Sequence, residues 1–392
     1  MKSKLSAALA AAGALVLPSW PSVRFGDPGR ERWGSMMRTK SLFGAAVTLA
    51  LFGATSQNAT AIVFNLGGLK MRIVPALFSS VIVCGLLAIR MATAADSPPA
   101  WAYTPNNPDY KPPVDDGKPV RVPDSTAGYT WSQLRDRFIA PVWHPSDHGA
   151  LPDIVANGRK PGVFACGFCH RATGPGGPEN ADLAGLPKSY IIQQMADYKS
   201  GARSTALPGR TPPKLMIELS KLTTDAEIDA AAAYFSALQP RKRIKVVESD
   251  TAPKTYVAGL LWAAVETGER EPIGARIVEV PDDLVRFESR DPRSTFTAYV
   301  PIGSIAKGEA LVMKGGSGKT IQCALCHGAY LTGLGPLPSI AGRSPSYMFR
   351  QLYDFRHGAR AGEWSPLMAQ AVANLDAQDL LAIVAYLASR DP

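Results

Sequence analysis

Apolar side chains recur at helical intervals in two segments that lie far apart in the chain, residues 190–200 and 347–357. Such spacing gives a helix one apolar stripe that can pack against a core. A glycine follows each segment, Gly201 and Gly358, at the position where helices commonly end. Both segments are therefore predicted to be amphipathic helices of similar length.

Two further helices are predicted from capping signals in their first turns. Thr224 and Glu227 have the spacing of a capping box, and the helix they begin should run to about residue 238. Asp376 and Asp379 have the same spacing before a segment that runs to about residue 389. Loops rich in glycine and proline separate these segments. The pattern predicts a mainly α-helical protein.

The stretch between the two helical regions, residues 239–302, has a different pattern. Strand-like apolar runs occur at 277–280 and 296–300, and prolines punctuate the rest. The stretch is too long for a bare linker, so we expect a partly β insert. Residues 95–128 are rich in proline and polar side chains, which predicts an extended arm.

The two helical regions are copies of one unit. Aligning Cys166 with Cys323 places residues 183–185 on 340–342 and residues 201–203 on 358–360, with similar side chains at each position. A unit that is used twice predicts two like domains. The expected organisation is a leader at 1–94, an arm at 95–128, a first domain at 129–238, an insert at 239–302 and a second domain at 303–392.

Composition and charge exclude some classes of function. Hydrophobic residues make up 46% of the chain and charged residues 19%, which suits packed domains rather than a disordered chain. The net charge of +9 is unevenly placed: of 42 basic and 33 acidic residues, ten and two lie in residues 1–94. The remaining 32 and 31 nearly cancel, so no nucleic-acid partner is predicted.

The leader contains three apolar runs, at 5–17, 42–53 and 73–89, each preceded by basic residues. Ala-x-Ala sequences follow the second and third runs, which is the layout of a secretory signal. Our interpretation is that translation starts at Met71 and that cleavage follows Ala94 or Ala95, so the protein is exported to the periplasm. The alternative is that one or two of the runs associate with the membrane as anchors.

Two C-x-x-C-H motifs carry the candidate chemistry. They comprise Cys166, Cys169, His170, Cys323, Cys326 and His327. This is the attachment signature of c-type haem: the thiols reach two vinyl groups on one porphyrin edge, and the imidazole faces the iron. A zinc site would need a fourth ligand, and a redox dithiol is more typical of a β-α-β setting. Two covalently bound haem c groups are therefore predicted.

A sixth iron ligand must come from elsewhere in each copy. Among the methionines after the leader, Met216 and Met368 are the pair that coincides when the copies are aligned, so both are predicted axial ligands. Both lie in proline-rich stretches that we expect to be loops. His144 and His148 have no counterpart in the second copy and could replace Met216, line a partner site or lie on the surface. His357 is expected to be a surface residue.

These residues resemble the class I cytochrome c family in its tandem diheme form. The resemblance is carried in the second copy by Cys323-Ala324-Leu325-Cys326-His327-Gly328, Pro338-Ser339-Ile340-Ala341-Gly342-Arg343, Tyr347, Gln351, Gly358, Arg360 and Met368. The first copy matches from Cys166 to Tyr234 with two departures. Arg171 follows the haem histidine where glycine is usual. Ala181 stands where the family commonly has a proline whose carbonyl supports that histidine.

The resemblance implies two class I cytochrome c domains that transfer single electrons in the periplasm. Histidine and methionine would fill both axial positions of each iron, which suits an electron carrier better than an enzyme. The implied partners are redox proteins, with a dehydrogenase or quinol-linked donor and an oxidase or other cytochrome as acceptor. A haem-bearing subunit of a periplasmic dehydrogenase is the main alternative. A diheme enzyme, such as a peroxidase or a thiosulfate-oxidising cytochrome, is a further one.

Overall fold

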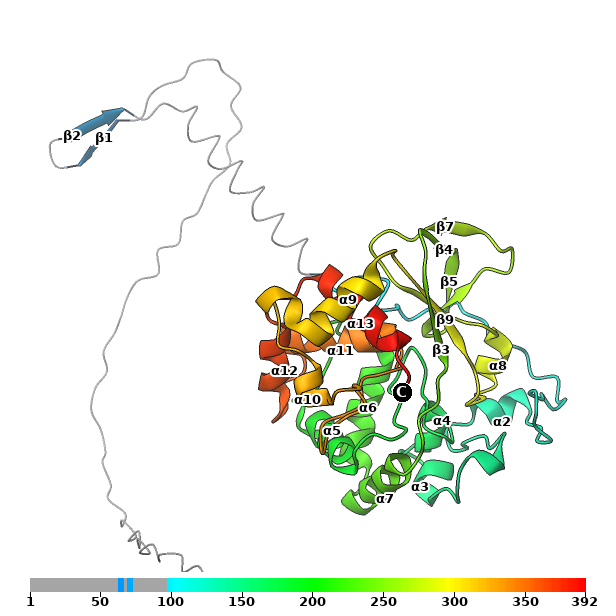
Figure 1. The fold of residues 1–392 in the computed structure, drawn as a ribbon. Helices are drawn as coiled ribbons and strands as arrows, with labels where there is room; N and C mark the ends of the chain where they lie inside the picture. The colour runs from blue at the N-terminus through cyan, green and yellow to red at the C-terminus, as the bar shows by residue number, and fades with distance from the viewer. Residues whose placement is uncertain (1–62, 67–68, 73–96) are drawn as a thin grey trace, which may run out of the picture. The chain divides into compact units, whose positions relative to one another are not determined.

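A computed structural model describes residues 63–66, 69–72 and 97–392 (Figure 1). The three apolar runs of the leader and the Ala-x-Ala sites lie outside the described residues, so the interpretation of the leader stays a prediction. Strands β1 (Val63–Leu66) and β2 (Leu69–Arg72) form an antiparallel pair of their own. All other described elements belong to a second unit.

The C-terminal copy is built around two helices that cross closely. Its elements are α9 (Ser304–Lys314), η2 (Gly315–Gly318), α10 (Ala324–His327), α11 (Pro345–Arg356), α12 (Ser365–Val372) and α13 (Ala377–Ser389). Helix α13 is buried along almost its whole length. Gly308 of α9 allows the close approach, because a Cβ there would overlap the carbonyl oxygen of Ala382 and the Cβ of Tyr386. The core of this copy is the largest in the molecule's described part.

The N-terminal copy has counterparts of α11, α12 and α13, but the helix before its motif is shorter than α9. Its elements are α2 (Trp131–Arg135), η1 (Pro145–Asp147), α3 (Asp153–Ala156), α4 (Cys166–His170), α5 (Lys188–Ser200), α6 (Thr211–Leu222) and α7 (Asp225–Ser236). Helix α3 is four residues long where α9 of the other copy is eleven. The apolar core of this copy is correspondingly smaller.

The helix ends follow the signals in the sequence. Thr224 and Asp376 cap α7 and α13, and in both cases the capping box is complete because the residue three positions on bonds back to the cap. Gly201 ends α5 in a left-handed conformation, with φ of 82°. The helices predicted from the sequence are therefore confirmed to within a few residues.

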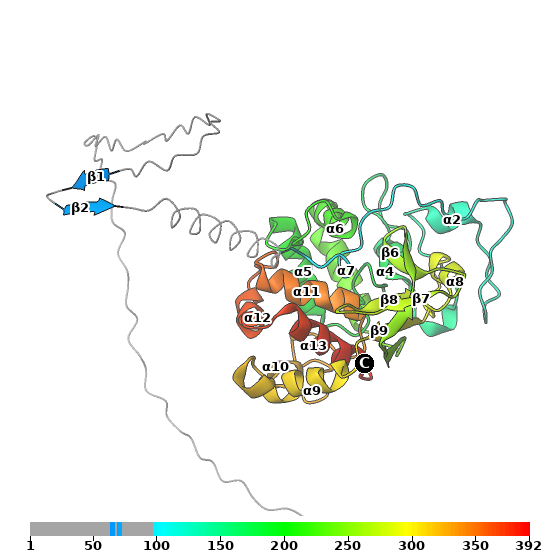
Figure 2. The same cartoon turned by 90° about the horizontal axis from the view of Figure 1, so that it is seen from above.

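Strands fill the region between the copies. They are β3 (Ile244–Glu248), β4 (Thr251–Pro253), β5 (Thr255–Ala258), β6 (Leu261–Ala264), β7 (Arg270–Pro272), β8 (Val278–Pro281) and β9 (Phe296–Val300), with helix α8 (Leu284–Glu288) before the last. The main sheet has the order β3-β9-β8, parallel between β3 and β9 and antiparallel between β9 and β8. Figure 2 shows these strands beside the helices rather than among them.

The segment that precedes the first copy packs against the second. The ring centroids of Trp101 and Phe349 of α11 lie 4.5 Å apart with the rings tilted by 59°, and the buried Tyr103 lies edge-on to Tyr353. The Tyr103 hydroxyl donates a hydrogen bond of 2.8 Å to Oδ1 of Asp354. These contacts anchor the start of the described unit on α11.

Within the described ranges, no single helix has the length and hydropathy of a membrane span. Helices α12 and α13 meet those limits only when taken together, and they are bent by 114° at their junction.

Replacing Gly308 with Ala tests the close crossing of α9 and α13. The added methyl group would force the helices apart, and we expect the free energy of unfolding to fall by about 1–3 kcal/mol. Chemical denaturation measures this. Gly149→Ala is the matched control, because a Cβ at Gly149 meets no atom within 4 Å. Equal stability of the two variants would contradict the close crossing.

Candidate functional site

All eight residues predicted to hold haem line one continuous cavity of about 930 Å³. They are Cys166, Cys169, His170, Met216, Cys323, Cys326, His327 and Met368. The first motif forms α4, and the second forms α10 with Cys323 at its cap. One helical turn therefore presents two thiols and an imidazole to the same space in each copy. Because the cavity is continuous, the two motifs open onto each other rather than onto separate pockets.

The two motif histidines are oriented by the same bond. Nδ1 of His170 lies 2.8 Å from the carbonyl oxygen of Ala181, and Nδ1 of His327 lies 2.8 Å from that of Pro338. The Nδ1–H donates in each case, which leaves Nε2 with its lone pair. Burial lowers the pKa of His170 to about 4 and also lowers that of His327, so both rings are neutral near pH 7. A neutral imidazole is the form that binds a metal.

The departure at Ala181 from the family pattern leaves this bond intact. The acceptor is a main-chain carbonyl, which every residue type carries, and its distance to the imidazole equals that in the second copy. Ala181 therefore supports the histidine through its carbonyl as a proline at this position would.

The two candidate methionines lie in helices, which corrects the expectation of loops. Met216 belongs to α6 and Met368 to α12, and each helix has proline in its first turn. Proline is compatible with that position because its missing N–H would have no partner there, and its fixed φ suits a helix. The proline-rich stretches that suggested loops are thus helix beginnings. Both methionines are half-buried and line the cavity.

Unpaired polar atoms in the cavity wall fit the expected cofactor. Buried atoms without a hydrogen-bond partner include Nε of Arg210, Oγ of Ser339 and Oδ1 of Asn180, and all three residues line the cavity. Burial lowers the pKa of Arg210 to about 9, as expected for a guanidinium taken out of water. Such atoms are costly unless a ligand meets them. A largely apolar ring that carries carboxylate groups would satisfy a cavity with this lining.

Two equivalent arginines join the copies across the cavity. Arg203 donates from Nη1 to Gln194 of its own copy at 2.8 Å and from Nη2 to Gln351 of the other copy at 2.8 Å. Arg360 returns the contact, donating from Nη2 to Gln194 at 2.7 Å and from Nη1 to Gln351 at 3.3 Å. Both guanidinium groups belong to buried residues. The repeat gave these residues as equivalent, but it could not show that each one bonds across to the other copy.

Main-chain bonds support the same junction. The amide of Ser204 donates to the carbonyl of Ala359 at 2.7 Å, and that of Ala361 donates to the carbonyl of Ala202 at 2.6 Å. Equivalent loops thus pair as a short antiparallel bridge. The junction fixes the two halves of the cavity relative to each other.

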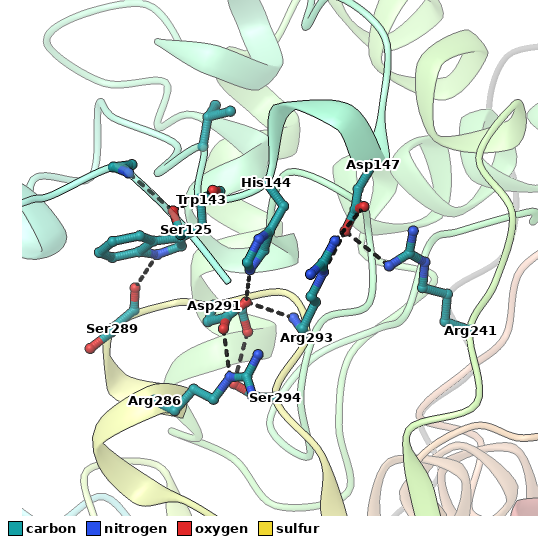
Figure 3. Close-up of polar contacts among 12 residues, drawn as sticks. Ser125, Trp143, His144, Asp147, Arg241, Arg286, Ser289, Asp291, Arg293 and Ser294 are labelled. Atoms are coloured by element: carbon teal, nitrogen blue, oxygen red, sulfur yellow. Dashed lines mark hydrogen bonds and ion pairs between the residues drawn. The ribbon is translucent and has the colours of Figure 1, made fainter. Parts of the chain in front are cut away.

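His144 and His148 do not line the cavity, and His144 is not a surface residue. Figure 3 shows His144 pointing toward Asp291. Nε2 of the buried His144 lies 3.0 Å from Oδ1 of Asp291, whose other oxygen accepts a bond from Arg286. The expectation that these histidines could replace Met216 has no support in this geometry. His144 instead helps to hold the segment after α2 against the region that follows α8. His357 is exposed, as expected.

An ion cluster extends the same contact. Asp147 accepts hydrogen bonds from Arg293 at 2.8 Å and from Arg241 at 2.9 Å. The bonds from Arg293 and Arg241 hold the pKa of Asp147 well below its usual range. Across the residues that the structure covers, no group of three or more His, Cys, Asp or Glu side chains is arranged to bind a bare metal ion.

Comparison with known proteins identifies relatives of this chain. The family model for cytochrome c matches residues 305–391. A thiosulfate dehydrogenase electron acceptor of Thiomonas intermedia is 25% identical over 234 residues, which is 59% of this chain and 80% of the relative. Cytochrome c4 of Azotobacter vinelandii is 25% identical over 248 residues, 61% of this chain and 89% of the relative.

Two solved structures match a little more than half of this chain. A thiosulfate dehydrogenase from Marichromatium purpuratum matches with a TM-score of 0.39 and 27% identity, over 58% of this chain and 37% of that one. Reduced cytochrome c4 from Pseudomonas stutzeri matches with a TM-score of 0.38 and 21% identity, over 57% of this chain and 93% of that one.

The chain contains a cytochrome c domain, and its relatives are electron-transfer cytochromes. It therefore carries covalently bound haem c, and it functions in electron transfer with other redox proteins.

Replacing Asp147 with Asn tests the ion cluster. A carboxylate whose folded pKa is depressed contributes stability above its unfolded pKa, and that stability is lost as the pH falls through the folded pKa. At pH 7 the variant should lose about 1–3 kcal/mol of unfolding free energy, and the difference from wild type should vanish in strong acid. Denaturation at several pH values measures this. Asp116→Asn, at an exposed carboxylate, should behave as wild type; a loss of the same size would contradict the assignment.

Proposed function

We propose that this chain is a periplasmic diheme cytochrome that passes single electrons from a dehydrogenase or quinol-linked donor to a downstream acceptor. One observation carries the proposal. Two C-x-x-C-H motifs open onto one continuous cavity, and their histidines are held by identical bonds to main-chain carbonyls. A single large cavity with two attachment points suits two haems that exchange electrons inside one protein.

The proposed residue roles follow from the chemistry of each side chain. The thiols of Cys166, Cys169, Cys323 and Cys326 form the thioether bonds, His170 and His327 are the proximal ligands, and Met216 and Met368 are the distal ligands. When bound, haem c supplies a one-electron iron couple. Binding of the iron by a histidine imidazole and a methionine thioether would favour a high reduction potential.

The chain's own groups keep the site in one protonation state. The carbonyls of Ala181 and Pro338 hold a proton on Nδ1 of each histidine, so Nε2 stays available as a ligand. The burial of both rings prevents their protonation near neutral pH. A ligand set that neither gains nor loses a proton suits transfer of an electron alone.

The domain organisation and location belong to the same proposal. We infer two class I cytochrome c domains, at 129–238 and 303–392, joined by the partly β insert at 239–302 and preceded by the arm at 95–128. The basic and apolar pattern of residues 1–94 supports export to the periplasm. Membrane association through those residues is the alternative that their apolar runs leave open.

A fixed electron acceptor for one dehydrogenase is the second candidate function. It is favoured by the relative in Thiomonas intermedia, whose name describes an acceptor for thiosulfate dehydrogenase. We propose a dehydrogenase acting on a small inorganic sulfur anion as the donor class to test first.

The surface beside the second motif is the proposed contact for that donor. Cys326 is exposed, and large apolar side chains around it are exposed as well: Ile321, Leu325, Trp364 and Leu367. Ile321, Trp364 and Leu367 also line the cavity that the haem would fill, whereas Leu325 does not, so Leu325 is the side chain of this face proposed to meet the partner. In the first motif Phe168, the equivalent of Leu325, is buried. An apolar face around an exposed thioether edge suits brief docking of another redox protein.

The visible spectrum of the full exported protein tests the function. Oxidised and reduced spectra should show two low-spin haems, a methionine-to-iron charge-transfer band and no carbon monoxide adduct. Met216→His and Met368→His should each remove about half of that band while keeping both irons closed. A carbon monoxide adduct of the wild-type protein would show an open iron and favour an enzyme such as a peroxidase.

Electron transfer from a purified thiosulfate dehydrogenase, with thiosulfate as reductant, tests the docking face. The variant Leu325→Glu should slow second-order reduction about tenfold, because the charge opposes burial against the partner and Leu325 does not line the haem cavity. Reduction by ascorbate should be unchanged. Val285→Glu is the control, since Val285 is equally exposed but lies on α8. A slower rate for the control alone would place the docking face elsewhere.

A further inference from the structure

Two arginines converge on one carbonyl oxygen inside the first haem motif. Phe168 stands between the two cysteines of that motif, and its carbonyl accepts a bond of 3.2 Å from Nη1 of Arg171. The same oxygen accepts a bond of 3.0 Å from Nη1 of Arg290. Arg171 directly follows the motif histidine, whereas Arg290 comes from the region after α8. Two cationic groups from distant parts of the sequence therefore meet at the attachment loop.

Neither guanidinium is held mainly by a carboxylate. Arg290 also donates from Nε to the carbonyl of Leu134 at 2.7 Å, and its guanidinium lies 3.5 Å from the centre of the Phe168 ring. Arg171 is 3% exposed and lies over the ring of Phe287 at 5.0 Å. Carbonyl oxygens and ring faces orient these charges without neutralising them. Much of their field therefore remains in the site.

The other charges near the pair are few and of both signs. Arg137 adds a further positive charge near Arg290 and Cys169, and Glu179 faces both arginines. Glu288 also faces Arg290, and it accepts a hydrogen bond from the hydroxyl of Tyr110. Asp291 also faces Arg171, but it is already paired with Arg286. Burial lowers the pKa of Arg290 to about 9, so it remains cationic at neutral pH. The balance near the first motif is positive.

The second motif lacks this arrangement. Gly328 replaces Arg171, with φ of 84° against 67° for the arginine, so both residues adopt the left-handed region that favours glycine. Arg290 is likewise left-handed, with φ of 61°. Such conformations are unfavourable for a side chain larger than glycine. Leu325, the equivalent of Phe168, is 66% exposed, whereas Phe168 is 7% exposed. The first copy thus has two arginines in strained backbone conformations beside its motif, whereas Leu325 of the second motif faces solvent.

We propose that Arg171 and Arg290 raise the reduction potential of the haem held by the first motif above that of the haem held by the second. This inference rests on the proposed binding of one haem by each motif. Reduction adds one electron and lowers the net charge of a site by one unit, so a fixed positive charge nearby stabilises the reduced form. The interaction is strengthened because Arg171 is buried and Arg290 is half-buried. One electron taken from a reductant then resides at the first site, and no proton moves.

A redox titration of the exported holoprotein, followed by its visible spectrum, measures the two potentials. Met368→His serves as the marker background, since the harder ligand lowers the potential of the second haem and identifies its step. In that background, Arg171→Gly and Arg290→Asn should each lower the reduction potential of the other step, which belongs to the first haem. Glycine and asparagine both tolerate left-handed backbone. Together they should change the equilibrium constant between the haems at least tenfold, which is about 59 mV for one electron.

Three further variants separate charge from structure. Arg171→Lys and Arg290→Lys keep the positive charge and lose the forked donor. The reduction potential of the first haem should therefore stay close to its wild-type value. Glu179→Gln removes the facing negative charge and should raise the reduction potential of the first haem. A loss of packing would not produce a shift of this sign. Arg356→Gln, at an exposed arginine of α11, is the matched control and should move neither step.

The possible failures are distinguishable. A haem content below two per chain would overturn the proposed function itself. Two haems with an unchanged first step in Arg171→Gly and Arg290→Asn would overturn the inference alone. The inference would also be wrong if the lysine variants lowered the step as much as the neutral ones, or if Glu179→Gln lowered it. Should a neutral arginine variant fail to fold, Glu179→Gln and the lysine variants still decide the matter.

Discussion

The rest of the site depends on the hydrogen bonds that Arg203 and Arg360 each donate to Gln194 and Gln351. Each guanidinium bonds to a glutamine of its own copy and to one of the other copy, so neither copy can satisfy its buried arginine alone. A buried cation that loses its partners is costly. The copies are therefore held in one relative position, and the two haem motifs open onto a shared cavity because of it.

The copies are equivalent at this junction and different away from it. At the first motif, α8 and the residues after it cover Phe168 and bring Arg290 to the attachment loop. At the second, Leu325 and Cys326 face solvent. The region between the copies thus does more than connect them, because it gives one motif a dry, positively charged setting. A duplicated unit acquires two distinct sites when only one copy is covered.

Local signals in the sequence were sufficient for the helices and for the residues around the cavity. The capping boxes at Thr224 and Asp376 are properties of four consecutive residues, so they could be read directly. Proline before Met216 and Met368 was misread because the same residue suits a loop and the first turn of a helix. The role of Arg290 could not be predicted, since it depends on contact with Phe168, 122 positions away.

The packing of Tyr103 on α11 has a consequence for how the chain folds. Tyr103 and Asp354 are 251 positions apart, so their bond cannot form until nearly the whole sequence is available. Contacts of such long sequence separation slow folding, because a large loop must close before they are formed. The arm should dock late, after the second copy has assembled. Until then the ring faces of Phe349 and Tyr353 lack their aromatic cover, and aggregation at that face competes with completion of the native state.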